Sequence, residues 1–180
     1  KYGVGSGGSR MLSGNLRIHR DYELAIAKFK GGEDAIVWST GYQANLGVIT
    51  ALMNPIKVGP QDYFRRRGII LSDELNHASI VDGCVASKQK KVVYRHRDMD
   101  DLERKLKRFK HRRKLVITDG VFSMEGDIAP LDKMVKLCKK YDSLLMVDEA
   151  HATGTLGNNG HGTLEYFSLK PGKDVDIVMG

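Results

Sequence analysis

The amino-acid sequence predicts an α/β fold, with a mostly parallel sheet between flanking helices. Short β-branched runs alternate along the chain with longer helical patterns, which is typical of stacked βαβ units. The runs LVIT (115–118) and LLMV (144–147) are apolar throughout, as expected of strands buried on both faces. The 180 residues contain four prolines, no repeat and no proline-rich linker, which is about the length of one domain.

The individual elements follow from local patterns. Helices are predicted where apolar residues recur at helical spacing, over Leu16–Lys30, Tyr42–Met53, Ala78–Ser87, Met99–Phe109 and Leu131–Tyr141. Strands are predicted at the β-branched runs AIVW (35–38), GIIL (68–71), KVVY (91–94), KLVITD (114–119), LLMVDE (144–149) and VDIVM (175–179). In the fourth helix, Leu102, Leu106 and Phe109 form one apolar stripe, so its basic residues should face solvent.

Composition excludes several classes of protein. The chain is 41% hydrophobic and 28% charged, as in soluble globular proteins. No apolar run approaches the ~18–20 residues of a membrane span, and the opening KYGVGSGG lacks the apolar segment of a secretory signal. Cys84 and Cys138 are the only cysteines and have no metal-like spacing. We therefore expect free thiols, no metal site, no membrane partner and a reducing, cytoplasmic location.

The net charge of +7 comes mainly from residues 63–68, 87–98 and 103–114. A solvated helix face explains the last of these better than a polyanion site does. An acidic partner stays possible in principle, either the phosphates of coenzyme A or an acidic carrier protein.

Polar residues follow the predicted strands, at the sheet edge where α/β proteins bind ligands. Gly41 and Tyr42 open a helix after Thr40, so their backbone N–H groups suit a phosphate, although an ordinary N-cap is the alternative. His77 follows the second strand and could act as a general base, as a ring that stacks on a ligand, or as a neighbour of a helix cap.

Three further strand-end residues belong to the same edge. Ser123 lies beyond Gly120, a residue that lets the chain turn sharply, and is either a free donor or a turn serine. Asp148 ends a buried strand, where a carboxylate is costly without a cationic partner, and His151 follows it. The convergence of four strand ends is stronger evidence for a site than any single residue.

The letters DEAH (148–151) also name an ATPase box of helicases, and a nucleic-acid-binding ATPase is the rival hypothesis. Such an enzyme needs a G-x-x-x-x-G-K-[ST] phosphate cradle before the box. The only Gly-Lys pair, Gly172-Lys173, is followed by Asp174 and lies after the box. We therefore expect no nucleic-acid partner.

Five stretches of the chain resemble the α-oxoamine synthases, and they occur in that family's order. They are YGVGSGGSRMLSGN (2–15), STGYQANLG (39–47), SDELNHASIVDG (72–83), TDGVFSMEGDIAPL (118–131) and VDEAHATGTLGNNGHG (147–162). The family consists of pyridoxal 5'-phosphate (PLP) enzymes of the aspartate aminotransferase fold. They condense an amino acid with an acyl thioester and release carbon dioxide.

The resemblance implies a role for each strand-end residue. The backbone of Gly41 and Tyr42 would hold the PLP phosphate. His77 would stack on the pyridine ring and approach the substrate carboxylate. Ser123 and His151 would donate hydrogen bonds to the phenolic oxygen, and Asp148 would face the ring nitrogen. His77, Asp148 and His151 are thus the expected catalytic residues.

The resemblance also implies substrates and partners. The motifs look most like the branch that joins alanine to an acyl-CoA or acyl-carrier-protein thioester in biotin synthesis, with the glycine-using and serine-using branches as alternatives. A homodimer is expected of the full-length enzyme. The 180 residues would form part of the PLP-binding large domain, and the Schiff-base lysine and the small domain would lie outside them, leaving this fragment inactive. A lysine-free partner subunit is the third hypothesis, and the four retained side chains argue against it.

Overall fold

The computed structural model describes residues 3–54 and 68–180. The chain divides into two compact units, residues 1–38 and 39–180, and the second contains the whole sheet. All the predicted site residues belong to this second unit.

The second unit is built on a five-stranded parallel sheet in the order β2-β1-β3-β4-β5. Its strands are β1 (Ile69–Asp73), β2 (Lys90–Tyr94), β3 (Lys114–Asp119), β4 (Leu144–Asp148) and β5 (Ile177–Met179). Its helices are α2 (Gly41–Met53), α3 (Ala78–Ala86), α4 (Met99–Arg108), α5 (Leu131–Lys140) and the short α6 (Thr163–Tyr166). The strand order changes direction between β1 and β3, which makes their carboxyl ends a topological switch point.

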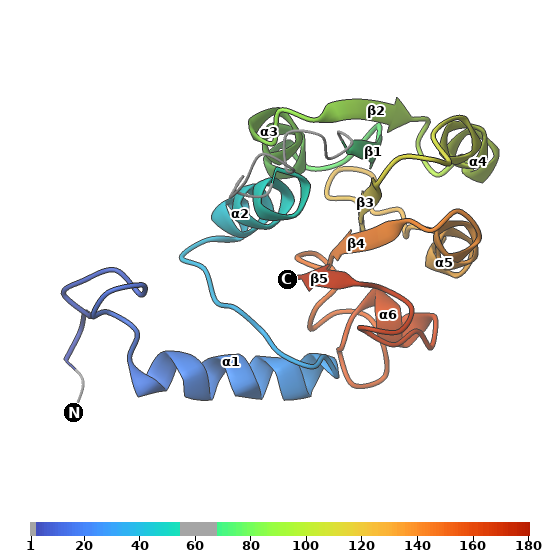
Figure 1. Cartoon of the computed structure of the whole chain (residues 1–180). Helices are drawn as coiled ribbons and strands as arrows, with labels where there is room; N and C mark the ends of the chain where they lie inside the picture. Colours follow the sequence, from blue (N-terminus) through green and yellow to red (C-terminus); the bar gives the residue numbers. More distant parts are fainter. Residues whose placement is uncertain (1–2, 55–67) are drawn as a thin grey trace. The chain divides into compact units, whose positions relative to one another are not determined.

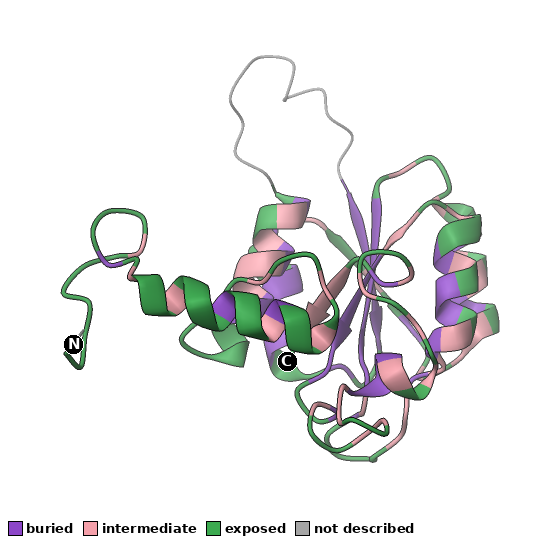
Figure 2. Cartoon of the chain, turned by 90° about the horizontal axis from the view of Figure 1, so that it is seen from below, coloured by how far each residue is buried: buried purple, intermediate pink, exposed green. Residues whose placement is uncertain are grey.

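Helices cover both faces of the sheet (Figure 1). Helices α2 and α3 pack on one face through Ile49, Ile80 and Cys84, and α4 and α5 pack on the other. All residues of β1 and β3 are buried, as Figure 2 shows for the centre of the sheet. Burial on both faces explains why these strands need uninterrupted apolar runs rather than alternating ones.

The elements agree closely with the sequence predictions. Each predicted helix lies within one residue of its observed bounds, and five of the six predicted strands lie within two. Leu102 and Leu106 of the α4 stripe are fully buried, and Phe109 packs against the same core. Helix α6 was not predicted, because four residues are too few for a helical period to be visible.

Both thiols are buried and free, as predicted. Burial raises the pKa of Cys84 to about 11 and that of Cys138 to about 12. Protonated, shielded thiols of this kind are unreactive.

The first unit contains α1 (Arg17–Lys30). One prediction for this unit differs from the structure. The strand predicted over 35–38 is wrong, since these residues form no strand. The N–H of Val37 donates instead to the buried Glu23 carboxylate (3.0 Å), and its carbonyl accepts from Arg10 (3.0 Å). Arg10 in turn donates to Glu23 (2.6 Å), so two side chains satisfy the backbone that a neighbouring strand would otherwise bind.

No described helix is both long and apolar enough to cross a membrane.

Helices α2 and α3 approach closely at Gly83. A Cβ atom at this position would lie 2.8 Å from Ile49 Cδ1 and 3.2 Å from the carbonyl oxygen of Asn45. The absence of a side chain at Gly83 therefore sets the distance between the two helices.

Replacing Gly83 should consequently destabilise the fold. Gly83→Val is expected to lower the free energy of unfolding by about 1–3 kcal/mol, because the core is overpacked. Val85→Ala, on the exposed face of the same helix, should change it by less than about 0.5 kcal/mol. Urea denaturation measures both, and an unchanged midpoint for Gly83→Val would contradict the close contact.

Candidate active site

Three carboxylates gather at the carboxyl edge of the sheet. Asp73, Asp119 and Asp148 are the last residues of the neighbouring strands β1, β3 and β4. Each is at most 5% exposed, and Asp119 pairs with Asp148 in the strand register. Parallel strands bring their carboxyl ends to one edge, so the site follows directly from the topology.

Within the part of the chain that the structure describes, Asp148 is bound only by neutral groups. Its Oδ2 accepts from the side-chain amide of Asn45 on α2 (2.8 Å), and its Oδ1 accepts from the N–H of Ala150 (3.0 Å). The sequence predicts a cationic partner for this buried carboxylate. None occurs among its contacts in residues 3–54 and 68–180, which are with Asn45 and Ala150. These donors fix the carboxylate and leave its charge available to a ligand.

A chain of hydrogen bonds connects Asp148 to His77. The amide nitrogen of Asn45 also donates to Ser79 Oγ (2.8 Å), and Ser79 Oγ lies 2.7 Å from His77 Nδ1. His77 is the N-cap of α3, where its Nδ1 accepts from the N–H of Ser79 (3.2 Å). His77 therefore has a capping role. Its ring is nevertheless exposed, so a role as a general base or as a ring that stacks on a ligand is compatible with the structure.

Asp119 is an unusual member of the group. Burial, and then the nearby charge of Asp148, raise its pKa to about 7. Its Oδ2 accepts from the N–H of His77 (3.2 Å), whereas its Oδ1 is buried without a partner in the described part of the chain. A carboxyl group with a perturbed pKa at a sheet edge is a frequent mark of a functional site.

The start of α2 offers free donors. Thr40 caps the helix by accepting from the N–H of Gln43 (3.1 Å), so the N-cap that the sequence offers as the alternative to a phosphate site is present. The amides of Gly41 and Tyr42 belong to the first turn, and within the described residues they have no acceptor. Gly41 lies near Met179 at the end of β5, where a Cβ would be 3.8 Å from the sulfur.

The Tyr42 side chain has a separate role from its backbone. Its hydroxyl donates a short hydrogen bond to Asp82 of α3, and this bond raises the pKa of the phenol.

Ser123 and His151 lie on the loops that follow the adjacent strands β3 and β4. Both are exposed, and the structure does not bring them into contact with Asp148 or His77. Gly120 differs from its expected role, because a Cβ there would lie 2.8 Å from Glu149 Oε1 and from Thr163 Oγ1. Close approach of α6 therefore requires this glycine, and its φ is not positive.

Glu149 argues against the ATPase hypothesis. Its side chain is fully buried, and its carboxylate accepts from the N–H (2.8 Å) and the hydroxyl of Thr163. A helicase box needs this glutamate to face a nucleotide, whereas here it holds Thr163, the first residue of α6.

The sequence did not single out Asn45, Ser79 and Asp119. The sequence does contain a signal for Asn45, because this residue lies four residues after Gly41 and therefore on the same helix face. The sequence also contains a signal for Asp119, since this residue ends a buried strand as Asp148 does.

Comparison with known proteins agrees with this geometry. The family model for aminotransferase class I and II matches residues 2–180. The chain is 51% identical to a putative 8-amino-7-oxononanoate synthase of Acetivibrio thermocellus and 52% identical to the 8-amino-7-oxononanoate synthase of Lysinibacillus sphaericus. Both comparisons cover 100% of the chain, and the chain spans 43% of the length of each relative.

Solved structures give the same result. A serine palmitoyltransferase from S. paucimobilis with a bound PLP–myriocin aldimine matches 99% of the chain at a TM-score of 0.87 and 41% identity, over 42% of its own length. An 8-amino-7-oxononanoate synthase from Francisella tularensis matches 94% of the chain at 0.73 and 31% identity, over 43% of its own length.

The predicted fold class and the predicted family are both confirmed. The chain belongs to the aminotransferase class I and II family, within its α-oxoamine synthase branch.

Proposed function

We propose that the protein carrying this chain is a PLP-dependent C-acyltransferase that condenses an amino acid with an acyl thioester and releases carbon dioxide. Alanine and a pimeloyl thioester, on coenzyme A or a carrier protein, are the proposed substrates. Relatives about half identical to the chain are named 8-amino-7-oxononanoate synthase, which supports this choice. The serine palmitoyltransferase structures make serine with a longer acyl chain the second candidate.

The observation that carries the proposal is the buried Asp148 carboxylate with neutral donors alone. A protonated pyridine nitrogen would supply the missing positive charge. The free amides of Gly41 and Tyr42, at the positive end of the α2 dipole, suit the phosphate. Two buried oxygens without partners in the described chain, Asn45 Oδ1 and Asp119 Oδ1, are what a polar ligand would face. The residues present therefore fit PLP.

PLP, when bound, supplies an electron sink for the α-carbon of the amino acid. Asp148 keeps the proton on the ring nitrogen, because an opposite charge within ~4–6 Å favours the charged form of each group. Asn45 and the Ala150 amide hold the carboxylate in one orientation, so little reorganisation is needed during the reaction.

The three exposed side chains, His77, Ser123 and His151, would contact the other parts of the cofactor and the substrate. His77 would stack on the pyridine ring and approach the substrate carboxylate, and its contact with Ser79 would fix the plane of the imidazole. Ser123 and His151 would donate hydrogen bonds to the phenolic oxygen. All three side chains are exposed in these 180 residues. The proposal includes the homodimer that the family resemblance implies, together with a cytoplasmic location that suits two free thiols.

Neutralising Asp148 tests the proposed role of its charge. Asp148→Asn in the full-length protein should keep the fold, because the two side chains have the same shape and the amide oxygen can still accept from one of the two donors, Asn45 or the Ala150 N–H. If the charge is worth about 3 kcal/mol in the transition state, kcat should fall more than about a hundredfold. Steady-state assays with alanine and pimeloyl thioesters measure this loss, and circular dichroism checks the fold. Asp142→Asn, at an exposed position far from the carboxyl edge of the sheet, is the matched control. Activity near the wild-type level in Asp148→Asn would refute the ring-nitrogen role.

The raised pKa of Asp119 predicts a pH dependence of stability. Between the unfolded pKa near 3.8 and the folded pKa of about 7, the folded state holds a proton that the unfolded state has released. Stability should therefore fall as pH rises through this window. Asp119→Asn cannot titrate, so relative to the wild type it should gain about 2–3 kcal/mol between pH 5 and pH 8.

Urea unfolding of the cofactor-free protein at the two pH values measures this gain. Asp142→Asn again serves as the control and should follow the wild type. If the Asp119→Asn and wild-type curves ran parallel, Asp119 would be ionised across the whole range.

A further inference from the structure

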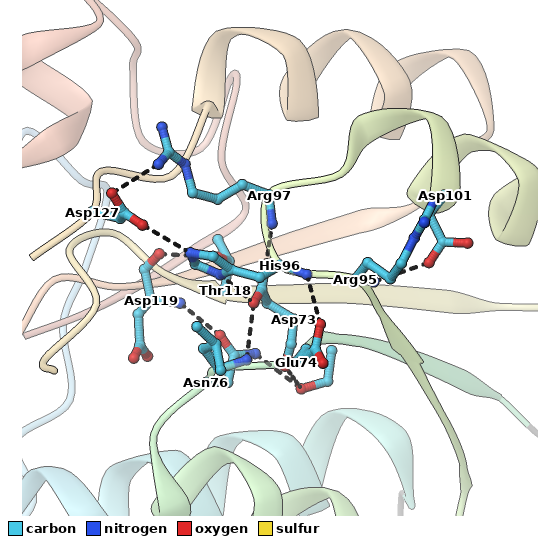
Figure 3. A network of polar contacts seen from close by, with 12 residues as sticks. Asp73, Glu74, Asn76, Arg95, His96, Arg97, Asp101, Thr118, Asp119 and Asp127 are labelled. Carbon is cyan, nitrogen blue, oxygen red and sulfur yellow. Dashed lines mark hydrogen bonds and ion pairs between the residues drawn. The ribbon is translucent and has the colours of Figure 1, made fainter. Parts of the chain in front are cut away.

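A histidine without a role in the proposed reaction lies at the centre of a polar network at the same sheet edge. His96 follows β2, and its side chain is 19% exposed. Its Nδ1 lies 2.9 Å from Asp73 Oδ1, and its Nε2 lies 3.2 Å from Asp127 Oδ2. Figure 3 shows the imidazole between these two carboxylates. His96 thus joins the ends of β1 and β2 to the loop that follows β3.

One side of this bridge is firmly held. Asp73 is buried, and its Oδ1 also accepts from the N–H of Leu75 (3.0 Å). Its Oδ2 accepts from the N–H of Arg97 (3.0 Å). A carboxylate that accepts from three donors has little freedom to move, so Asp73 holds His96 at a fixed position beside the sheet.

The other side of the bridge is the loop that carries Ser123. The N–H of Phe122 donates to the carbonyl of Asp127 (3.0 Å), and the N–H of Gly126 donates to the carbonyl of Phe122 (2.9 Å). These two bonds close residues 122–127 into a compact turn that includes Ser123. The turn meets the bridge at Asp127 and at Phe122, whose ring packs edge-on against His96 at 4.4 Å between centroids.

The beginning of the same loop is attached to the site itself. The N–H of Gly120 donates to the carbonyl of Asp148 (2.7 Å). The loop is therefore attached to the backbone of Asp148 at its beginning, and to His96 and Arg97 through Asp127 near its end. The location of Ser123 relative to Asp148 depends on both attachments.

We propose that His96 is a positioning residue for the reaction, which clamps the 120–128 loop between Asp73 and Asp127 and so sets Ser123 for its hydrogen bond to the cofactor. This inference rests on the proposed function, because it needs a ligand that Ser123 contacts. His96 touches neither substrate nor cofactor and acts through the loop.

The clamp is strongest when both ring nitrogens carry protons, since each faces a carboxylate oxygen. Burial opposes the charge of His96, but the hydrogen bonds to Asp73 and Asp127 outweigh it and raise the pKa of the ring. The other charged groups nearby are Glu74, whose carboxylate accepts from the N–H of His96 (3.1 Å), and Arg97, which donates to Asp127 (2.8 Å). The contribution of the clamp is therefore full below the ordinary pKa of histidine, near 6.5, and is lost as pH rises through the raised value.

Hydrogen exchange of the full-length protein without cofactor tests the clamp directly. His96→Gln keeps one donor but loses the charge, and Asp127→Asn weakens the clamp from the more exposed, loop side. Each variant should accelerate exchange of the 120–128 amides about tenfold or more at pH 6, because a charge-assisted bond is lost. For His96→Gln the difference from wild type should shrink at pH 9, whereas Asp127→Asn also loses the ion pair with Arg97 and should keep part of its difference. Arg95→Gln, a neighbouring surface residue that does not touch the loop, should leave this exchange unchanged.

Kinetics then test whether the clamp acts through Ser123. We expect His96→Gln to lower kcat about tenfold while changing the KM for the acyl thioester less than about twofold. The double variant His96→Gln/Ser123→Ala should be no slower than Ser123→Ala alone, because two residues that act through one contact are not additive.

The outcomes separate this inference from the proposed function. Faster loop exchange together with non-additive kinetics supports the inference. Unchanged loop exchange, or additive losses of kcat in an active enzyme, would overturn it and leave the proposed function intact. A wild-type protein that neither binds PLP nor forms product would refute both the proposed function and the role of His96 in that reaction.

Discussion

The unneutralised charge of Asp148 is the constraint around which the site is organised. A buried carboxylate needs compensation, and here two neutral N–H donors hold it without cancelling its charge. Burial, and then the charge of Asp148, raise the pKa of the neighbouring Asp119. Asn45 connects Asp148 to Ser79, which in turn contacts His77. Each of these features makes sense if a cation occupies the space beside Asp148 during function.

The sheet topology explains why so few residues create such an environment. Parallel strands bring Asp73, Asp119 and Asp148 to one edge, and the reversal in strand order between β1 and β3 leaves room there. The two outer carboxylates then serve different ends. Asp73 is saturated by donors and anchors the surrounding loops, whereas Asp148 is held but not neutralised. Similar residues at equivalent strand ends therefore differ in role because their donors differ.

Much of this arrangement follows from the sequence. Uninterrupted apolar runs identified β3 and β4, and the residue after each run gave Asp148 and the loops of Ser123 and His151. The strand expected over 35–38 failed because Glu23 and Arg10 satisfy the Val37 backbone, a long-range contact that no local pattern reveals. The links through Asn45 and Ser79 were missed for the same reason, since they join helices whose packing depends on Gly83. Roles of individual residues came from the family resemblance, and the geometry alone would have given only a group of carboxylates near a helix start.

The two shielded thiols have a practical consequence. A cysteine introduced at the exposed tip of the 122–127 turn, for example at Met124, would be the only readily alkylated sulfur in this chain. A fluorescent dye attached there could report movements of the turn in real time without removal of either native cysteine. The burial of both native thiols thus makes this chain suitable for site-specific labelling.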